Sequence, residues 1–220
     1  MRIVIVEDHQ MFREVLHKVC TAELRHQVVG EAGDGATAVR LVHETRPDLV
    51  LLDLHLPSLN GFDVIEGIRK DLPETKVLVL SSHCDEYTVY QAERARVSGF
   101  VDKNTNSVDT LKAAITAVAR GTTWFSEAFL TLKAARRRDP RSFDKLLTKR
   151  ESSVLTLIGQ SLTDAEIGKS LDISAETVEK HRFNLLKKLE LKSTTQLARY
   201  AREHGFTLTA PKSDDDALLP

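Results

Sequence analysis

The chain has 220 residues, of which 41% are hydrophobic and 29% are charged, and its formal net charge is −1. Its longest apolar runs have the length of strands, and no charged-then-apolar leader precedes Ile3, so we expect neither a transmembrane helix nor a signal peptide, and a cytoplasmic location. The length exceeds that of one typical domain and therefore predicts two.

The first half of the chain alternates strands and helices five times. Apolar runs of strand length occur at residues 2–6, 48–52, 76–80 and 99–102, and the turn Gly33-Asp34-Gly35 follows another strand. Helical spacing of apolar residues appears between them, as at Val64, Ile65 and Ile68. The pattern predicts a doubly wound α/β domain over residues 1–120, with a five-stranded parallel sheet.

Acidic residues stand where two of these strands end. Glu7 and Asp8 follow the first strand, and Asp53 follows the run at residues 48–52. Since ligands of parallel sheets bind beyond the carboxyl ends of the strands, we expect the three carboxylates to share one crevice. Their mutual repulsion requires a cation, and oxygen ligands without cysteine favour Mg²⁺. Such a site suits phosphoryl chemistry with Asp53 as the nucleophile.

Two further strand ends carry groups that can bind a phosphoryl oxygen, namely Ser81 and Lys103. With the spacing Asp53, Pro57, Gly61, this half of the chain resembles the receiver domain of bacterial two-component response regulators, which has a flavodoxin-like fold. The resemblance implies a role for each matching residue: phospho-acceptor Asp53, metal ligands Glu7, Asp8, Asp53 and the backbone carbonyl of His55, switch hydroxyl Ser81, switch aromatic Phe100, and phosphate-contacting Lys103.

Each of these residues also has a simpler interpretation. Glu7 and Asp8 could cap the following helix, Ser81 could be an ordinary loop hydroxyl, and Lys103 could be a solvated loop lysine. The helix cap is compatible with metal binding. It is the joint occurrence at successive strand ends that favours the phosphoryl site.

Two histidines lie two residues beyond Asp53 and Ser81, at His55 and His83. We hypothesise that they flank the phosphoryl group and set its lifetime, although exposed loop histidines without a role explain the pattern equally well. Cys84 could be a redox-sensitive thiol near the phosphate or an inert loop cysteine, and Cys20 is expected to fill the core.

The pattern loosens over residues 121–146, which we interpret as an interdomain linker that could begin with a short helix. The arginine run at residues 136–138 could contact DNA phosphate, but a solvated linker is the better interpretation. Residues 121–220 hold 17 Lys and Arg against 14 Asp and Glu, whereas residues 1–120 hold 14 against 18. The excess of positive charge in the second half favours an anionic partner such as DNA.

The second half contains two helix starts of the same kind. Thr148 and Thr163 are each followed three residues later by glutamate, Glu151 and Glu166, which is the spacing of a capping box. A tight connection at residues 172–174 then leads to a third helix that begins near Ala175. This arrangement predicts a helix-turn-helix in a four-helix, all-α domain over residues 147–207, followed by a flexible tail at residues 208–220.

The third helix has one apolar and one polar face. Helix-turn-helix proteins place such a helix in the major groove. The candidate DNA-binding residues on its polar face are Thr177, Lys180, Asn184, Lys187 and Lys188. For a helix alone, a solvated face with a stray aromatic at Phe183 would be the preferred interpretation, but the preceding helix and tight turn favour DNA binding.

The stretch from Leu147 to Ala201 resembles the LuxR-type helix-turn-helix domain. The resemblance rests on Leu147-Thr148-x-Arg150-Glu151, Glu166-Ile167-Gly168, Ile173-Ser174-x-x-Thr177-Val178-x-x-His181 and Asn184-x-x-x-Lys188-Leu189. Glu179 departs from the family, where many relatives carry lysine, so the other candidates must supply more of the DNA contact. Together, the two halves look like a NarL/FixJ-type transcription factor.

This resemblance implies a sensor histidine kinase that phosphorylates Asp53 with Mg²⁺ present, promoter DNA as a partner, and a homodimer that forms on phosphorylation. For the dimer we propose one face of the last helix, formed by Leu197, Tyr200, Ala201 and His204, with core packing of that face as the alternative. Two other functions remain open: a DNA-binding regulator independent of phosphorylation, and a Mg²⁺-dependent phosphohydrolase that uses Asp53 as a transient nucleophile. We expect a protein that is not an enzyme, because the sequence indicates neither a substrate pocket nor a general acid.

Overall fold

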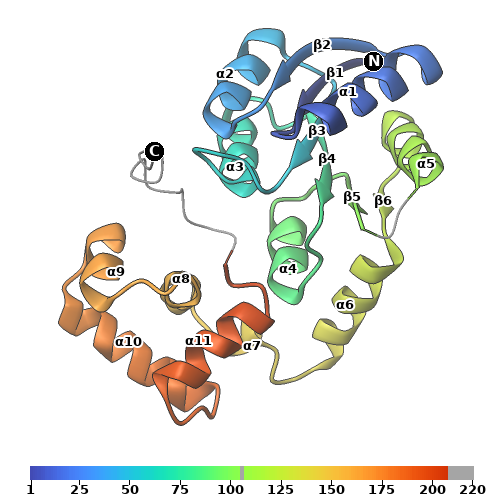
Figure 1. The fold of residues 1–220 in the computed structure, drawn as a ribbon. Helices are drawn as coiled ribbons and strands as arrows, with labels where there is room; N and C mark the ends of the chain where they lie inside the picture. Colours follow the sequence, from blue (N-terminus) through green and yellow to red (C-terminus); the bar gives the residue numbers. More distant parts are fainter. Residues whose placement is uncertain (105–106, 208–220) are drawn as a thin grey trace. The chain divides into compact units, whose positions relative to one another are not determined.

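The computed structural model describes residues 1–104 and 107–207 in two compact units (Figure 1). Residues 1–84 and 91–130 form the first unit; residues 85–90 and the described residues from Thr131 onward form the second. The tail predicted at residues 208–220 lies outside the described residues. Within the part of the chain that is described, no helix is long and apolar enough to cross a membrane.

The first unit is built on a parallel sheet, as the sequence predicted. Its strand order is β2-β1-β3-β4-β5-β6, and every neighbouring pair is parallel. The strands are β1 (Arg2–Val6), β2 (Gln27–Ala32), β3 (Leu49–Asp53), β4 (Lys76–Ser81), β5 (Gly99–Asp102) and β6 (Trp124–Phe125). The sheet therefore has six strands where five were expected, because β6 adds a short edge strand from the predicted linker.

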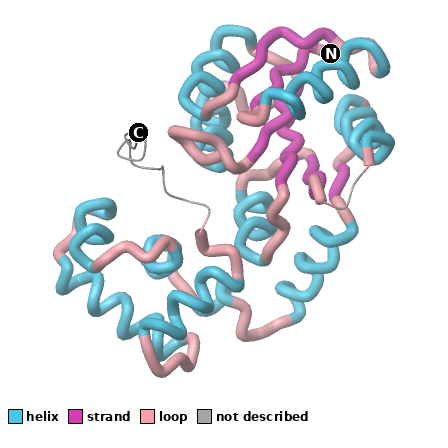
Figure 2. Tube along the Cα trace, viewed as in Figure 1, coloured by secondary structure: helices cyan, strands magenta, loops and turns pink. Residues whose placement is uncertain are grey.

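Helices cover both faces of this sheet, as the tube in Figure 2 makes visible. They are α1 (Gln10–Lys18), continued by the π-helix η1 (Val19–Glu23), and α2 (Gly35–Thr45), α3 (Gly61–Asp71) and α5 (Val108–Ala119). A further helix, α4 (Glu86–Arg94), begins in the second unit and ends in the first. Apolar residues of α1 and α5 pack with Ile3, Leu51 and Leu78 in one core on one face. The strands' other side chains, such as Val4 and Leu52, are also fully buried, which explains why the strands are continuous apolar runs.

The predicted linker is more ordered than the sequence suggested. It contains β6, α6 (Glu127–Arg138) and α7 (Phe143–Leu146). Phe129 of α6 lies in the first unit, with its ring centroid 4.6 Å from that of Phe125, and Phe143 is buried in the second. Arg136 is not solvated as expected: it is buried, and its guanidinium donates to Asp144 at 2.7 Å. A buried, paired arginine has a structural role here.

The second unit contains the predicted helix-turn-helix. Its further helices are α8 (Lys149–Gly159), α9 (Asp164–Leu171), α10 (Ala175–Lys188) and α11 (Thr194–Glu203). Both predicted capping boxes are present, at Thr148 with Glu151 and at Thr163 with Glu166. The turn between α9 and α10 needs Gly168, because a Cβ there would lie 2.6 Å from the carbonyl oxygen of Ile173. These local features fix the two helices around a shared core.

Candidate functional site

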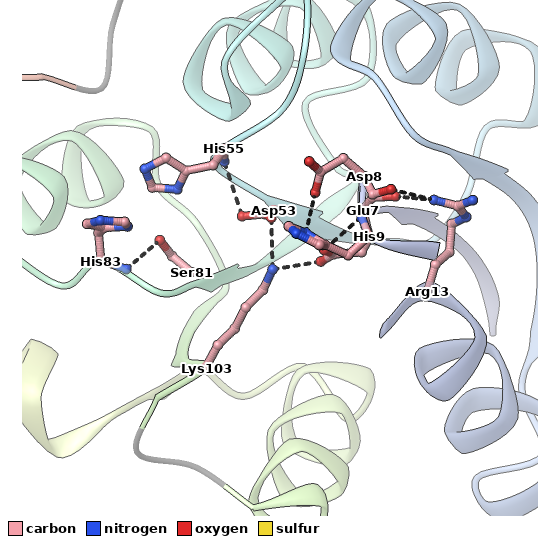
Figure 3. Close-up of polar contacts among 9 residues, drawn as sticks. All are labelled: Glu7, Asp8, His9, Arg13, Asp53, His55, Ser81, His83 and Lys103. Carbon is pink, nitrogen blue, oxygen red and sulfur yellow. Dashed lines mark hydrogen bonds and ion pairs between the residues drawn. The ribbon is translucent and has the colours of Figure 1, made fainter. Parts of the chain in front are cut away.

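The ends of four parallel strands bring the predicted phosphoryl-site residues together (Figure 3). Asp53 is the last residue of β3 and Ser81 the last of β4, while Glu7 follows β1 and Lys103 follows β5. Glu7, Asp53 and Ser81 are buried, and the Asp8 side chain is half-buried. All carboxyl ends of a parallel sheet meet at one edge, which is why residues far apart in sequence gather here.

Lys103 is the electrostatic centre of the site. Its Nζ donates to Glu7 Oε2 at 2.7 Å and to Asp53 Oδ2 at 2.8 Å. The same ammonium lies 4.9 Å from the centroid of the Phe12 ring. One cation therefore bridges two buried carboxylates that come from different strands.

This single cation does not fully compensate the buried charge. Burial raises the pKa of Glu7, the hydrogen bond from Lys103 lowers it, and the charge of Asp53 raises it again; the pKa stays above its ordinary 4.5. A raised carboxyl pKa means that the site disfavours its own negative charge. Additional positive charge would therefore be favourable here.

The donor set fits a hard divalent cation. Glu7, Asp8 and Asp53 offer carboxylate oxygens, and no cysteine lies among them. One ligand atom from each of Glu7, Asp8 and His9 lies within 4.8 Å of the other two. The acidic pair is not the cap of α1, because the N-cap residue is His9, so the simpler interpretation of Glu7 and Asp8 is wrong.

Two residues near the acidic pair were missed in the sequence. His9 Nδ1 lies 2.8 Å from Asp8 Oδ1, and Arg13 donates from its guanidinium to the backbone carbonyls of Glu7 and Asp8. The adjacency of His9 to the acids was a usable signal. No sequence pattern pointed to Arg13, because its contact depends on how α1 turns back toward the end of β1.

Gly61 lets the loop after β3 close against the site. A Cβ at Gly61 would lie 2.7 Å from both the carbonyl oxygen of Asp53 and the Cα of Leu54. Asn60, the N-cap of α3, accepts from the backbone N–H groups of Phe62 and Asp63. The predicted spacing from Asp53 to Gly61 thus reflects a close approach of two backbone segments.

The two predicted switch residues, Ser81 and Phe100, are both buried. Ser81 is buried, and its Oγ accepts from the backbone N–H of His83 at 3.1 Å. Phe100 on β5 is also buried, with its ring centroid 5.1 Å from that of Phe129 on α6. Sequence placed Ser81 and Phe100 on their strands, but the contact of Phe100 with α6 was not foreseen.

The structure brings His55 and His83 together at the mouth of the site. Their ring centroids are 4.4 Å apart, and both side chains are exposed. His55 also donates its backbone N–H to Asp53 Oδ1 at 3.1 Å. Cys84, which follows His83 in the sequence, is half-buried. Cys20 is buried in the core as expected, and burial raises the pKa of its thiol to about 12.

The candidate DNA-binding residues on α10 differ in their exposure and in the contacts that they make. Asn184 and Lys187 are exposed, and Lys180, also exposed, lies 3.0 Å from Glu176 on the same face. The hydroxyl oxygen of Thr177 lies 2.8 Å from that of Ser174, the N-cap residue, and the two are hydrogen-bonded. Lys188 differs, because its Nζ contacts the buried Glu151 at 2.7 Å. That pairing gives Lys188 a structural role, and its assignment to the DNA contact stays a prediction.

The predicted dimerisation face is corrected at two of its four residues, Leu197 and Ala201. Leu197 and Ala201 are fully buried in the core of the second unit, so core packing describes these two side chains. Tyr200 stacks on His204 with ring centroids 4.1 Å apart, and burial, with the nearby charges of Glu86 and Asp139, raises the pKa of Tyr200 to about 12. Leu197 and Ala201 are therefore not available to pair two chains.

Comparison with known proteins matches both halves of the chain. Residues 3–116 match the response regulator receiver domain, and residues 145–201 match the bacterial regulatory proteins of the luxR family. The response regulator protein VraR of Staphylococcus aureus is 33% identical over 206 residues, which cover 94% of this chain and 98% of VraR.

Solved structures give the same picture. A LuxR-family two-component response regulator from Aurantimonas is 31% identical with a TM-score of 0.58, covering 63% of this chain and 98% of that one. RcsB from Salmonella enterica serovar Typhimurium, bound to a promoter in the presence of a phosphomimetic, has a TM-score of 0.64 at 21% identity, covering 92% of this chain and 98% of that one. The second likeness is one of fold.

Proposed function

Since the chain belongs to the NarL/FixJ-type response regulators, DNA-binding transcription regulators with a receiver domain and a sensor histidine kinase as partner, we propose that phosphorylation of Asp53 is the event that switches it. The observation that carries the proposal is the bridge from Lys103 to Glu7 and Asp53, at 2.7 and 2.8 Å. It gathers an acceptor carboxylate, a cation and a metal-ligand candidate within one site.

This arrangement supports phosphoryl transfer to Asp53. A carboxylate oxygen of Asp53 bonds to phosphorus while the phosphorus–nitrogen bond of the kinase's phosphohistidine breaks, and the imidazole nitrogen leaves with the bonding pair and takes up a proton. Glu7, Asp8 and Asp53, with the backbone carbonyl of His55, would hold Mg²⁺, which supplies positive charge to the phosphoryl oxygens when bound. Lys103 donates to one of these oxygens, and the Ser81 hydroxyl donates to another.

A face beside the site suits the kinase. Met11 and Val15 of α1 and Val108 of α5 are exposed apolar side chains, with 80%, 38% and 46% of their surface accessible. Val15 and Val108 line a small pocket together with Lys103. Exposed apolar residues beside Lys103, which itself contacts Asp53, offer a partner protein surface to bury close to Asp53.

The exposed face of α10 is the proposed DNA contact, with Lys180, Asn184 and Lys187 reaching phosphates and base edges. Phosphorylation would move Ser81 and Phe100 and favour a dimer on DNA, through a surface that does not use Leu197 or Ala201. We also place the protein in the cytoplasm, where promoter DNA is accessible.

The decisive test is DNA affinity with and without beryllofluoride and Mg²⁺, which mimic the phosphorylated state. Operators would come from a genomic-fragment pull-down followed by footprinting. We expect tighter, dimeric binding with the mimic and no response in Asp53→Asn. Asp48→Asn is the matched control, because Asp48 lies at the opposite end of β3, where it accepts from the Arg2 backbone N–H at 2.7 Å. Equal affinity with and without the mimic would favour regulation independent of phosphorylation.

The alternative of a phosphohydrolase is tested separately. Multiple turnover of small phosphoesters, lost in Asp53→Asn, would support an enzyme. A single phosphorylation event per chain would support the regulator.

A further inference from the structure

One large apolar side chain stands exposed on the helix proposed to enter DNA. Phe183 of α10 has 68% of its surface accessible, while Val178 and Leu185 on the opposite face are fully buried. Single exposed apolar residues are ordinary on protein surfaces and need no explanation by themselves. The setting of Phe183 is what distinguishes it.

Phe183 lies between two lysines on the exposed face. Lys180 precedes it by three residues and Lys187 follows it by four, so both are its neighbours one helical turn away. All three side chains are exposed. A phenyl ring flanked by Lys187 and by Lys180, whose ammonium also lies 3.0 Å from Glu176, fits a partner that is anionic on either side of an apolar spot. A DNA major groove has this chemistry, because phosphates border it and thymine presents a methyl group within it.

The helix that carries Phe183 is fixed at three points. Ser174 caps its start by accepting from the Thr177 backbone N–H, and Lys188 near its end is held by Glu151. Arg182, the residue before Phe183, forms an ion pair with Asp164 of α9. These contacts hold α10 against α8 and α9, so Phe183 is presented on a rigid element and loses little freedom on binding.

We propose that Phe183 is a base-reading residue that contacts the 5-methyl group of a thymine in the operator. The inference rests on the proposed DNA-binding function of α10 and adds the base that one position recognises. It assigns a role to the aromatic side chain that stands among the polar candidates on this face.

The test compares thymine with uracil, which lacks only the 5-methyl group. Once an operator has been selected with the full-length protein, each thymine is replaced by uracil in turn and the dissociation constant is measured. We expect about a fourfold loss of affinity at one position per half-site, which corresponds to one buried methyl group. Phe183→Ala should bind the thymine and uracil operators equally, and Phe183→Leu should retain part of the difference.

Leu130→Ala serves as the matched control, since Leu130 is an exposed apolar residue of the first unit, with 50% of its surface accessible. It should keep the full thymine preference. Thermal unfolding of Phe183→Ala should match the wild type, because the side chain is mostly exposed.

Sequence-specific DNA binding without any uracil effect, or a uracil effect that persists in Phe183→Ala, would overturn this inference and leave the proposed function intact. A wild-type protein that binds no DNA in either phosphorylation state would overturn both. If Phe183→Ala instead abolished self-association measured by sedimentation, with the thymine preference unchanged, the ring would be a contact between chains and the inference would be wrong.

Discussion

Lys103 Nζ lies 2.8 Å from Asp53 Oδ2, although 50 residues separate them in the chain. The same ammonium holds Glu7 at 2.7 Å, so the proposed acceptor carboxylate and a metal-ligand candidate share one counter-ion. Removal of that counter-ion should therefore destabilise the charged form of both carboxylates.

We expect Lys103→Ala to lower the free energy of unfolding without metal by about 3–5 kcal/mol at neutral pH, because it leaves two buried carboxylates uncompensated. Added Mg²⁺ should restore more stability in this variant than in the wild type. Thermal unfolding with and without MgCl₂ measures both effects. Lys112→Ala, which removes a surface ion pair with Glu23, is the control and should change little. A Lys103→Ala protein as stable as the wild type would contradict the electrostatic account.

Gly61→Ala should distort the site. Its Cβ would meet the Asp53 carbonyl oxygen and the Leu54 Cα at 2.7 Å, and overpacking against backbone costs about 1–3 kcal/mol. We expect lower stability in chemical denaturation and slower phosphorylation by a small-molecule phosphodonor. The control is Gly67→Ala in α3, where a Cβ meets only Val39 methyl groups at 3.3 and 3.4 Å. Equal behaviour of the two variants would contradict the proposed close approach.

His55 and His83 should affect the lifetime of the phosphorylated state. Their rings are 4.4 Å apart beside Asp53, so they can control the approach of water to the acyl phosphate. We expect the double alanine variant to change the dephosphorylation half-life roughly two- to tenfold, about 1 kcal/mol in the barrier. Decay of the phosphoprotein on phosphate-affinity gels measures this. His43→Ala on α2 is the control, and an unchanged half-life in the double variant would refute the idea.

Glu151 should make the second unit sensitive to acid. Burial acts to raise its pKa, but hydrogen bonds from Lys188 and Thr148 outweigh it and hold the pKa below its ordinary 4.5. A depressed pKa in the folded state contributes stability above pH 4.5 that is lost as the pH falls through the folded value. Glu151→Gln should therefore be less stable than the wild type at pH 7, and the difference should shrink toward pH 3.

The second capping box provides the comparison for that pH series. Glu166 makes the same contacts with Thr163 but is exposed and has no lysine partner in the described structure. At pH 7, Glu166→Gln should lower the free energy of unfolding by less than Glu151→Gln does. Thermal unfolding across the pH range measures both. A larger loss there would show that the Lys188 contact contributes little.

The sequence by itself determined the parts that depend on local pattern and strand order. Apolar runs of strand length predicted the parallel sheet, and polar residues at the run ends predicted that Glu7, Asp53, Ser81 and Lys103 lie at one edge of it. The capping boxes at Thr148 and Thr163 were correct because they join residues three apart, within one helical turn.

Only the tertiary structure decided which side chains are already engaged. Lys188, a predicted DNA contact, is already paired with Glu151, 37 residues away. Leu197, a predicted dimer contact, is fully buried. His55 and His83 become neighbours because β3 and β4 are adjacent in the sheet. Helical periodicity gives the direction of a side chain but not the element that packs against it, because that depends on contacts between distant parts of the chain.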